Sequence, residues 1–103
     1  MKYSISSQYF NSVFKSSVVL KTSHITYRFL KTDQESLSGV SFVINKRLGL
    51  SVERNKFKRI LRSLYCRTFV ENNIKIAVII SPKTIKLKKE EIIKSFELLK
   101  KNI

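Results

Sequence analysis

Apolar residues occupy every second position in two segments of the chain, residues 25–29 and 40–44. This spacing is typical of strands with one buried face. The polar segment Lys31–Ser38 between them predicts the turn of a hairpin. A third segment, Ile74–Ile80, is almost continuously apolar, as in a strand buried on both faces. The pattern therefore predicts three main strands, with room for a further short strand near Val18.

Three segments carry apolar residues at helical spacing instead: Ser7–Lys15, Val52–Phe69 and Lys88–Lys101. The predicted order is α-β-β-α-β-α. Such alternation favours an α/β fold in which helices pack on a small mixed sheet. The length of 103 residues predicts one domain, spanning residues 1–103.

The middle helix separates its charged residues from its apolar ones. At about 100° per residue, Phe57, Leu61 and their apolar neighbours share one arc. The opposite arc carries five polar residues: Arg54, Asn55, Lys58, Arg59 and Arg62. Acidic partners one turn away are almost absent, so a merely solvated helix surface is a poor explanation. This face predicts contact with a polyanion.

The overall charge agrees with that prediction. The formal net charge is +14, and seven Phe and four Tyr residues supply stacking surfaces beside the cations. Single-stranded RNA is therefore at least as suitable a partner as duplex DNA. Proteins that read duplex DNA usually place a helix in the major groove through a dimer or a helix-turn-helix. Neither feature is evident in the sequence, so a DNA-binding role is the least favoured.

The sequence gives little support for a protein-borne active site or metal site. Cys66 is the single cysteine and His24 the single histidine, which disfavours a disulfide or a Cys/His metal cage. The candidate carboxylates for a two-metal nuclease centre are Asp33, Glu35, Glu90 and Glu91. They lie in a polar turn and at a helix start, without the inward spread such a centre needs. No segment contains a continuous apolar stretch as long as that of a signal peptide or a membrane span, so we expect a cytoplasmic protein.

The basic segment resembles a known family. It reads Lys46-Arg47-x-Gly49-x-Ser51-Val52-x-Arg54-Asn55-x-x-Lys58-Arg59-x-x-Arg62. This ordered set is similar to the signature of the bacterial ribonuclease P protein subunit. The resemblance extends over nearly the whole chain, from the aromatic first helix to the amphipathic last one. Departures are Ser51 in place of the usual Ala, Ser63 in place of an acidic residue, and Ser81 before the proline.

The resemblance implies a small sheet with a left-handed β-α-β crossover around the basic helix. It also implies a protein subunit that joins a catalytic RNA and assists removal of the 5′ leader from precursor tRNA. In that family the chemistry belongs to the RNA and its Mg²⁺ ions. We therefore expect no catalytic or metal-binding side chain, no membrane partner and no DNA partner. The alternative is a basic RNA-binding protein without enzymatic involvement, such as a small ribosomal protein.

The expected site residues form two groups. Those expected to contact RNA are Lys46, Arg47, Arg54, Asn55, Lys58, Arg59 and Arg62. Phe10, Phe14 and Tyr27 are either core residues, as their spacing favours, or lining of the leader cleft, as the resemblance implies. Gly49 indicates a positive φ or a close backbone approach in the turn before the basic helix.

Overall fold

The computed structural model describes residues 4–103. Its helices and strands are α1 (Ser7–Ser16), β1 (Val18–Lys21), β2 (Ile25–Lys31), β3 (Gly39–Phe42), α2 (Ser51–Tyr65), β4 (Ile76–Pro82) and α3 (Lys89–Lys101). The predicted α/β fold and its three helices are confirmed. The additional short strand near Val18 is β1, so the order is α-β-β-β-α-β-α.

The four strands form one sheet in the order β1-β2-β4-β3, with β4 antiparallel to β2 and parallel to β3. The prediction that Lys31–Ser38 closes a hairpin is therefore wrong, because β4 lies between β2 and β3. The segment holds a 3₁₀ turn, Glu35–Leu37, instead. The five residues Ile76–Ile80 are all buried, and a strand buried on both faces needs a central position. The hairpin of this fold is β1–β2.

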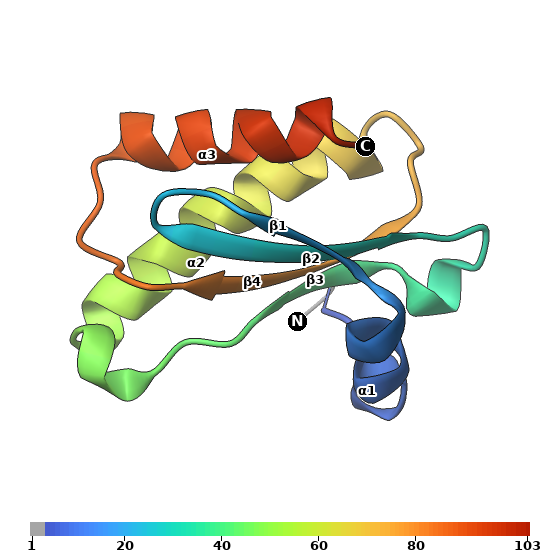
Figure 1. The fold of residues 1–103 in the computed structure, drawn as a ribbon, viewed down its shortest axis with the longest axis horizontal. Coiled ribbons are helices and arrows are strands. Elements are labelled where there is room, and N and C mark those ends of the chain that lie inside the picture. Colours follow the sequence, from blue (N-terminus) through green and yellow to red (C-terminus); the bar gives the residue numbers. More distant parts are fainter. Residues whose placement is uncertain (1–3) are drawn as a thin grey trace.

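Helix α2 forms the crossover between the parallel neighbours β3 and β4 (Figure 1). The left-handed sense of this crossover stays a prediction from the resemblance. After Tyr65 the helix continues as a π-helical turn, Cys66–Val70, which agrees with the helical segment predicted up to Phe69. In the connection that follows this turn, Asn73 has a φ of 56°.

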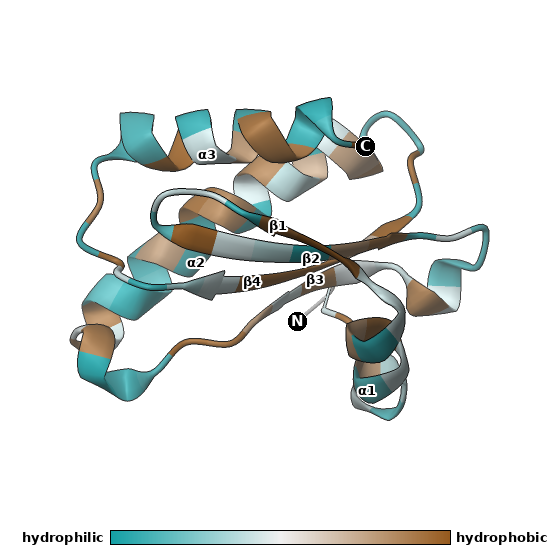
Figure 2. Ribbon diagram, in the orientation of Figure 1, coloured by the Kyte–Doolittle hydropathy of each residue, from teal (hydrophilic) through white to brown (hydrophobic). Residues whose placement is uncertain are grey.

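The sheet has helices on both faces (Figure 1). Helices α2 and α3 cover the face that carries Tyr27, Val78 and their neighbours, and this side holds the larger core. Helix α1 covers the other face, where Val13 packs with Ala77 and Ile79. Figure 2 shows polar and apolar turns alternating along α3, as expected for a helix with one buried stripe. The two faces therefore offer different surroundings to the side chains of one strand.

Helices α2 and α3 begin without a capping side chain at the residue before the first turn. In each helix, the glutamate three residues after this position accepts a hydrogen bond from the backbone N–H at this position. Glu53 Oε1 accepts from the backbone N–H of Leu50 at 2.9 Å, and Glu91 Oε1 accepts from that of Lys88 at 3.0 Å. Each carboxylate thus satisfies a free N–H and places negative charge at the positive helix end.

Candidate nucleic-acid interface

Helix α2 separates its two arcs in space as its spacing predicts. Phe57 and Leu61 are buried in the larger core. On the opposite arc Asn55 and Arg59 are exposed, while Arg54, Lys58 and Arg62 are half-buried. The packing of the apolar arc fixes the rotation of the helix, so the cations lie on a rigid surface.

The guanidinium groups of the two half-buried arginines of this arc contact neighbouring side chains. The Arg62 guanidinium carbon lies 5.6 Å from the centroid of the Phe42 ring. Arg54 donates from Nη2 to the Ser51 hydroxyl at 3.0 Å. The Nε atoms of both arginines are buried without a hydrogen-bond partner among residues 4–103. These contacts orient the guanidinium groups before any ligand arrives, which suits bidentate phosphate binding.

An open groove of about 610 Å³ lies between α1, β3 and α2. We call it the basic groove. Its lining includes Phe10, Asn11, Ser41, Phe42, Lys58 and Arg62. It joins two features that the sequence predicts separately, the cationic arc of α2 and the aromatic side of α1. A groove of cations, amide and hydroxyl groups and an aromatic ring can bind a single nucleic-acid strand by ionic contact and stacking.

Phe10 and Phe14 lie one turn apart on α1, with ring centroids 6.2 Å apart. Phe10 is half-buried against the sheet and lines the basic groove. Phe14 is 36% exposed. Both rings therefore keep a surface available to a ligand, and their role as leader contacts stays a prediction.

Of the two alternatives for Tyr27, the structure supports the core. Its side chain is fully buried on the other face of the sheet, in edge contact with Phe96 at 6.3 Å. Its hydroxyl lies 3.0 Å from the Ser95 hydroxyl, and burial raises the pKa of Tyr27 to about 12. Tyr27 is a core residue. Its neighbour Arg28 faces α1 instead, and the alternation along β2 was the signal that could have identified it.

Lys46 and Arg47 lie in a 3₁₀ turn, Lys46–Leu48, that precedes α2. Both are exposed, and neither lines the basic groove. The Asn45 side chain accepts from the backbone N–H of Arg47 at 2.9 Å and fixes this turn. The two cations thus continue the basic surface beyond the start of α2.

Gly49 has an extended φ of 166°, so the expectation of a positive φ is wrong and that of a close approach is correct. A Cβ atom at this position would lie 2.9 Å from Glu53 Oε1 and 2.9 Å from Ile85 Cδ1. Glycine therefore makes room for the carboxylate that caps α2.

The acidic residues are kept away from this surface. All seven lie outside the strands and outside α1. Glu53 is the single acidic residue of α2, in its first turn. No ion pair within residues 4–103 neutralises Arg54, Lys58 or Arg62. The positive potential of the groove is therefore available to an external anion.

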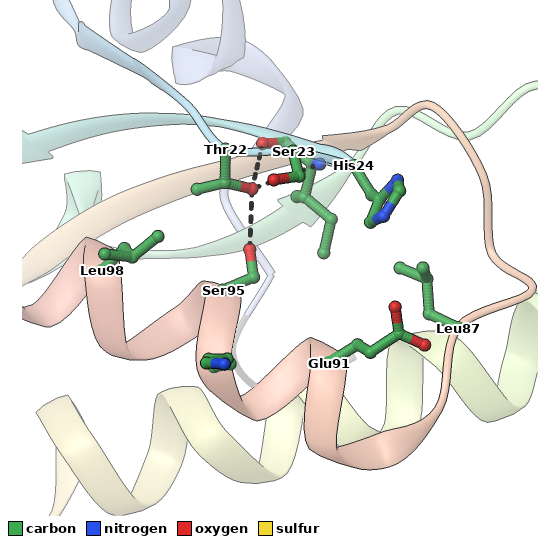
Figure 3. A pocket seen from close by; sticks show the side chains of 9 residues that line it. Thr22, Ser23, His24, Leu87, Glu91, Ser95 and Leu98 are labelled. Carbon is green, nitrogen blue, oxygen red and sulfur yellow. Dashed lines mark hydrogen bonds between the residues drawn. The ribbon is translucent and has the colours of Figure 1, made fainter.

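A smaller cavity of about 260 Å³ lies on the other face of the sheet, between the β1–β2 turn and α3 (Figure 3). Thr22 Oγ1 lies 2.8 Å from Ser95 Oγ, and this contact ties the hairpin to α3. The side chains of His24 and Glu91 also line the cavity (Figure 3). Within the described part of the chain, His, Cys, Asp and Glu side chains form no group of three that could hold a metal ion.

No helix within residues 4–103 is both long and apolar enough to cross a membrane.

Three solved structures with the same fold are RNase P proteins. The RNase P protein from Thermotoga maritima has a TM-score of 0.72 at 19% identity, covering 91% of this chain and 90% of that one. That from Staphylococcus aureus has a TM-score of 0.73 at 18% identity, covering 93% and 89%. A further S. aureus structure has a TM-score of 0.68 at 22% identity, covering 92% and 83%. At these identities the likeness shows the fold.

A search of curated protein sequences gave no match. The sequence profile of the family described as Ribonuclease P, in contrast, matches residues 5–103, which is nearly the whole chain. The chain thus belongs to the Ribonuclease P family and is a protein subunit of ribonuclease P, which acts with RNA partners in processing the 5′ end of tRNA.

Proposed function

We propose that the cationic arc of α2 and the adjoining turn bind the catalytic RNA of ribonuclease P, while the basic groove holds the 5′ leader of precursor tRNA. One observation carries this proposal: Phe10 of α1 and Lys58 and Arg62 of α2 line the same groove. The aromatic ring offers a surface for a base, and the cations offer contacts for phosphates.

In this proposal the catalytic RNA performs the hydrolysis, with Mg²⁺ ions held by RNA. The protein supplies positive charge between two polyanions that would otherwise repel each other. That charge strengthens substrate binding more than it changes the chemical step, and it lowers the Mg²⁺ concentration needed. We expect the assembled particle in the cytoplasm, with no membrane or DNA partner.

The test compares reconstituted particles with RNA alone at limiting Mg²⁺. The protein should lower the KM for a precursor with a leader, and it should tighten binding of that precursor more than binding of mature tRNA. Equal effects on both RNAs would contradict a leader-binding role. Lack of any effect on cleavage at low Mg²⁺ would contradict the electrostatic role.

A matched pair of variants locates the effect in the groove. Lys58→Ala with Arg62→Ala removes two charges from the groove, and Lys100→Ala with Lys101→Ala removes two exposed charges from the end of α3. The first pair should lose most of the preference for the leader. The second pair should retain it, because neither Lys100 nor Lys101 lines the basic groove.

The alternative of a basic RNA-binding protein without enzymatic involvement is not favoured by family membership. It predicts RNA binding without leader preference and without stimulation of cleavage. The kinetic comparison therefore separates the two functions, whereas a salt titration alone does not, because both predict steep salt dependence.

A further inference from the structure

Arg28 occupies a distinctive position on the face of the sheet that α1 covers. Its guanidinium carbon lies 4.0 Å from the centroid of the Phe14 ring, which is close enough for stacking and a cation–π contact. One face of the guanidinium is therefore covered by the ring. The side chain is half-buried, so its position is more restricted than that of a surface arginine.

The donors of this guanidinium are free for another partner. Within residues 4–103, Arg28 makes no hydrogen bond and no ion pair, although it carries five N–H groups. A guanidinium that stacks by its face presents these donors at its edge. Such an edge matches the two oxygens of a phosphate.

The neighbouring residues on this face also suit an anion. Directly opposed residues of paired strands point to the same face. Lys21, Thr26 and Ser81 form one such row across β1, β2 and β4, immediately beside Arg28. The row contributes one cation and two hydroxyl groups, and none of the seven acidic residues lies in a strand.

Arg28 also lies in line with the basic groove. In the next row Arg28 is opposite Ile79, and Ile79 is opposite Ser41, which lines the groove. Two spacings between neighbouring strands amount to about 10 Å. A short stretch of single-stranded RNA can therefore reach from the groove to Arg28 along the side of α1.

We propose that Arg28, stacked on Phe14, binds a phosphate of the single-stranded 5′ leader and so makes leader binding salt-dependent without making it selective for bases. This inference rests on the proposed function and adds a contact on the far side of α1 from α2. A base cannot stack on the side of the Phe14 ring that the guanidinium occupies, so contact there is made with the phosphate.

The experiment measures the Kd of the reconstituted particle for a precursor with a leader and for mature tRNA over a series of salt concentrations. Arg28→Gln should weaken binding of the precursor about tenfold or more and leave mature tRNA unaffected. The slope of log K against log[salt] should become less steep by about 0.7, the value for one phosphate on a single strand. Changing the leader bases should not alter the size of the loss.

Two further variants complete the test. Lys101→Gln, which removes an exposed charge from α3, should leave the leader preference unchanged. Arg28→Lys should keep the salt slope but lose part of the affinity, because an ammonium lacks the planar fork. Thermal melts of each variant identify any loss of folded protein.

An unchanged slope and affinity in Arg28→Gln would overturn the inference, as would an equal loss for mature tRNA or a loss that depends on the leader bases. Full affinity of Arg28→Lys for the precursor would contradict the role of a planar guanidinium stacked on Phe14. If the unaltered protein gives no leader preference, the proposed function fails as well. A leader preference that is present in the unaltered protein and undiminished in Arg28→Gln rejects the inference alone.

Discussion

The guanidinium carbon of Arg62 lies 5.6 Å from the centroid of the Phe42 ring, which places a cation of the α2 arc against the edge strand β3. Phe42 in turn meets Phe57 of the core edge-on at 6.5 Å. Arg62 therefore belongs to the basic groove and also to the packing between α2 and the sheet. Arg59, on the same arc, is exposed and has no such contact among the described residues.

This difference predicts distinct effects of two similar substitutions. Arg59→Ala should weaken RNA binding and leave the free energy of unfolding unchanged within about 0.5 kcal/mol. Arg62→Ala should weaken RNA binding and also lower the free energy of unfolding by about 0.5–1 kcal/mol, through loss of the contact with Phe42. Denaturant unfolding beside RNA-binding assays checks both. Equal stability of the two variants would contradict the packing role of Arg62.

Phe57→Ala should act on stability rather than on RNA contact. The Phe57 side chain is 2% exposed, and removing a buried aromatic ring typically costs about 3–5 kcal/mol. The measurement is the midpoint and slope of urea unfolding. Lys56→Ala is the matched control because Lys56 is the adjacent, exposed residue of α2. A Phe57→Ala variant as stable as that control would contradict the assigned core.

Gly49→Ala should disturb the start of α2. The added methyl group would lie 2.9 Å from Glu53 Oε1, so the carboxylate must move away from the Leu50 N–H. Loss of such a cap costs about 1 kcal/mol. The double variant Gly49→Ala with Glu53→Ala provides the control. If the methyl group acts by displacing the cap, the two losses will be clearly less than additive; full additivity would reject that explanation.

Buried tyrosines should make the fold sensitive to alkali. Burial raises the pKa of Tyr27 and of Tyr65 from 10.0 to about 12. Between these values the unfolded chain has released the phenolic protons and the folded chain still holds them. The folded state therefore binds more protons, and its stability falls as the pH rises from about 10 to about 12.

Tyr27→Phe tests this pH dependence. The variant loses the contact with Ser95, which costs about 1 kcal/mol at neutral pH. Between about pH 10 and 12, the free energy of unfolding of the variant should also fall less steeply, by about 1.4 kcal/mol per pH unit, the value for one proton. Urea unfolding at several alkaline pH values measures the slope. An unchanged slope would mean that Tyr27 ionises in the folded state as readily as in the unfolded one.

Local patterns predicted the helices and strands because each reflects a short-range periodicity. The sorted faces of α2 followed from its own residues, and the apolar run Ile76–Ile80 correctly indicated a strand buried on both faces. Strand neighbours depend on contacts between distant segments. The polar segment Lys31–Ser38 suits either a hairpin turn or a longer connection, so its residues could not reveal that β4 lies between β2 and β3.

For the site, too, the sequence predicted the residues on one helix but not those brought together by the sheet. Helical spacing identified the cations of α2 without further information. The sheet side of the groove required knowledge of which face α1 covers, and without it Tyr27 stayed open between the core and the leader cleft. The structure shows that Tyr27 meets Phe96 of α3 in the core, whereas Arg28 meets Phe14 of α1.

The central position of β4 governs the order of events during synthesis. Strands β2 and β3 do not pair with each other. Each pairs with β4, which ends at Pro82. A nascent chain that still lacks this segment can form the β1–β2 hairpin and parts of α2, but β3 then has no strand to pair with. Long-range pairing of this kind delays completion of the fold. The basic groove should thus be complete only after β4 has been synthesised, although its α1, β3 and α2 residues come earlier in the chain.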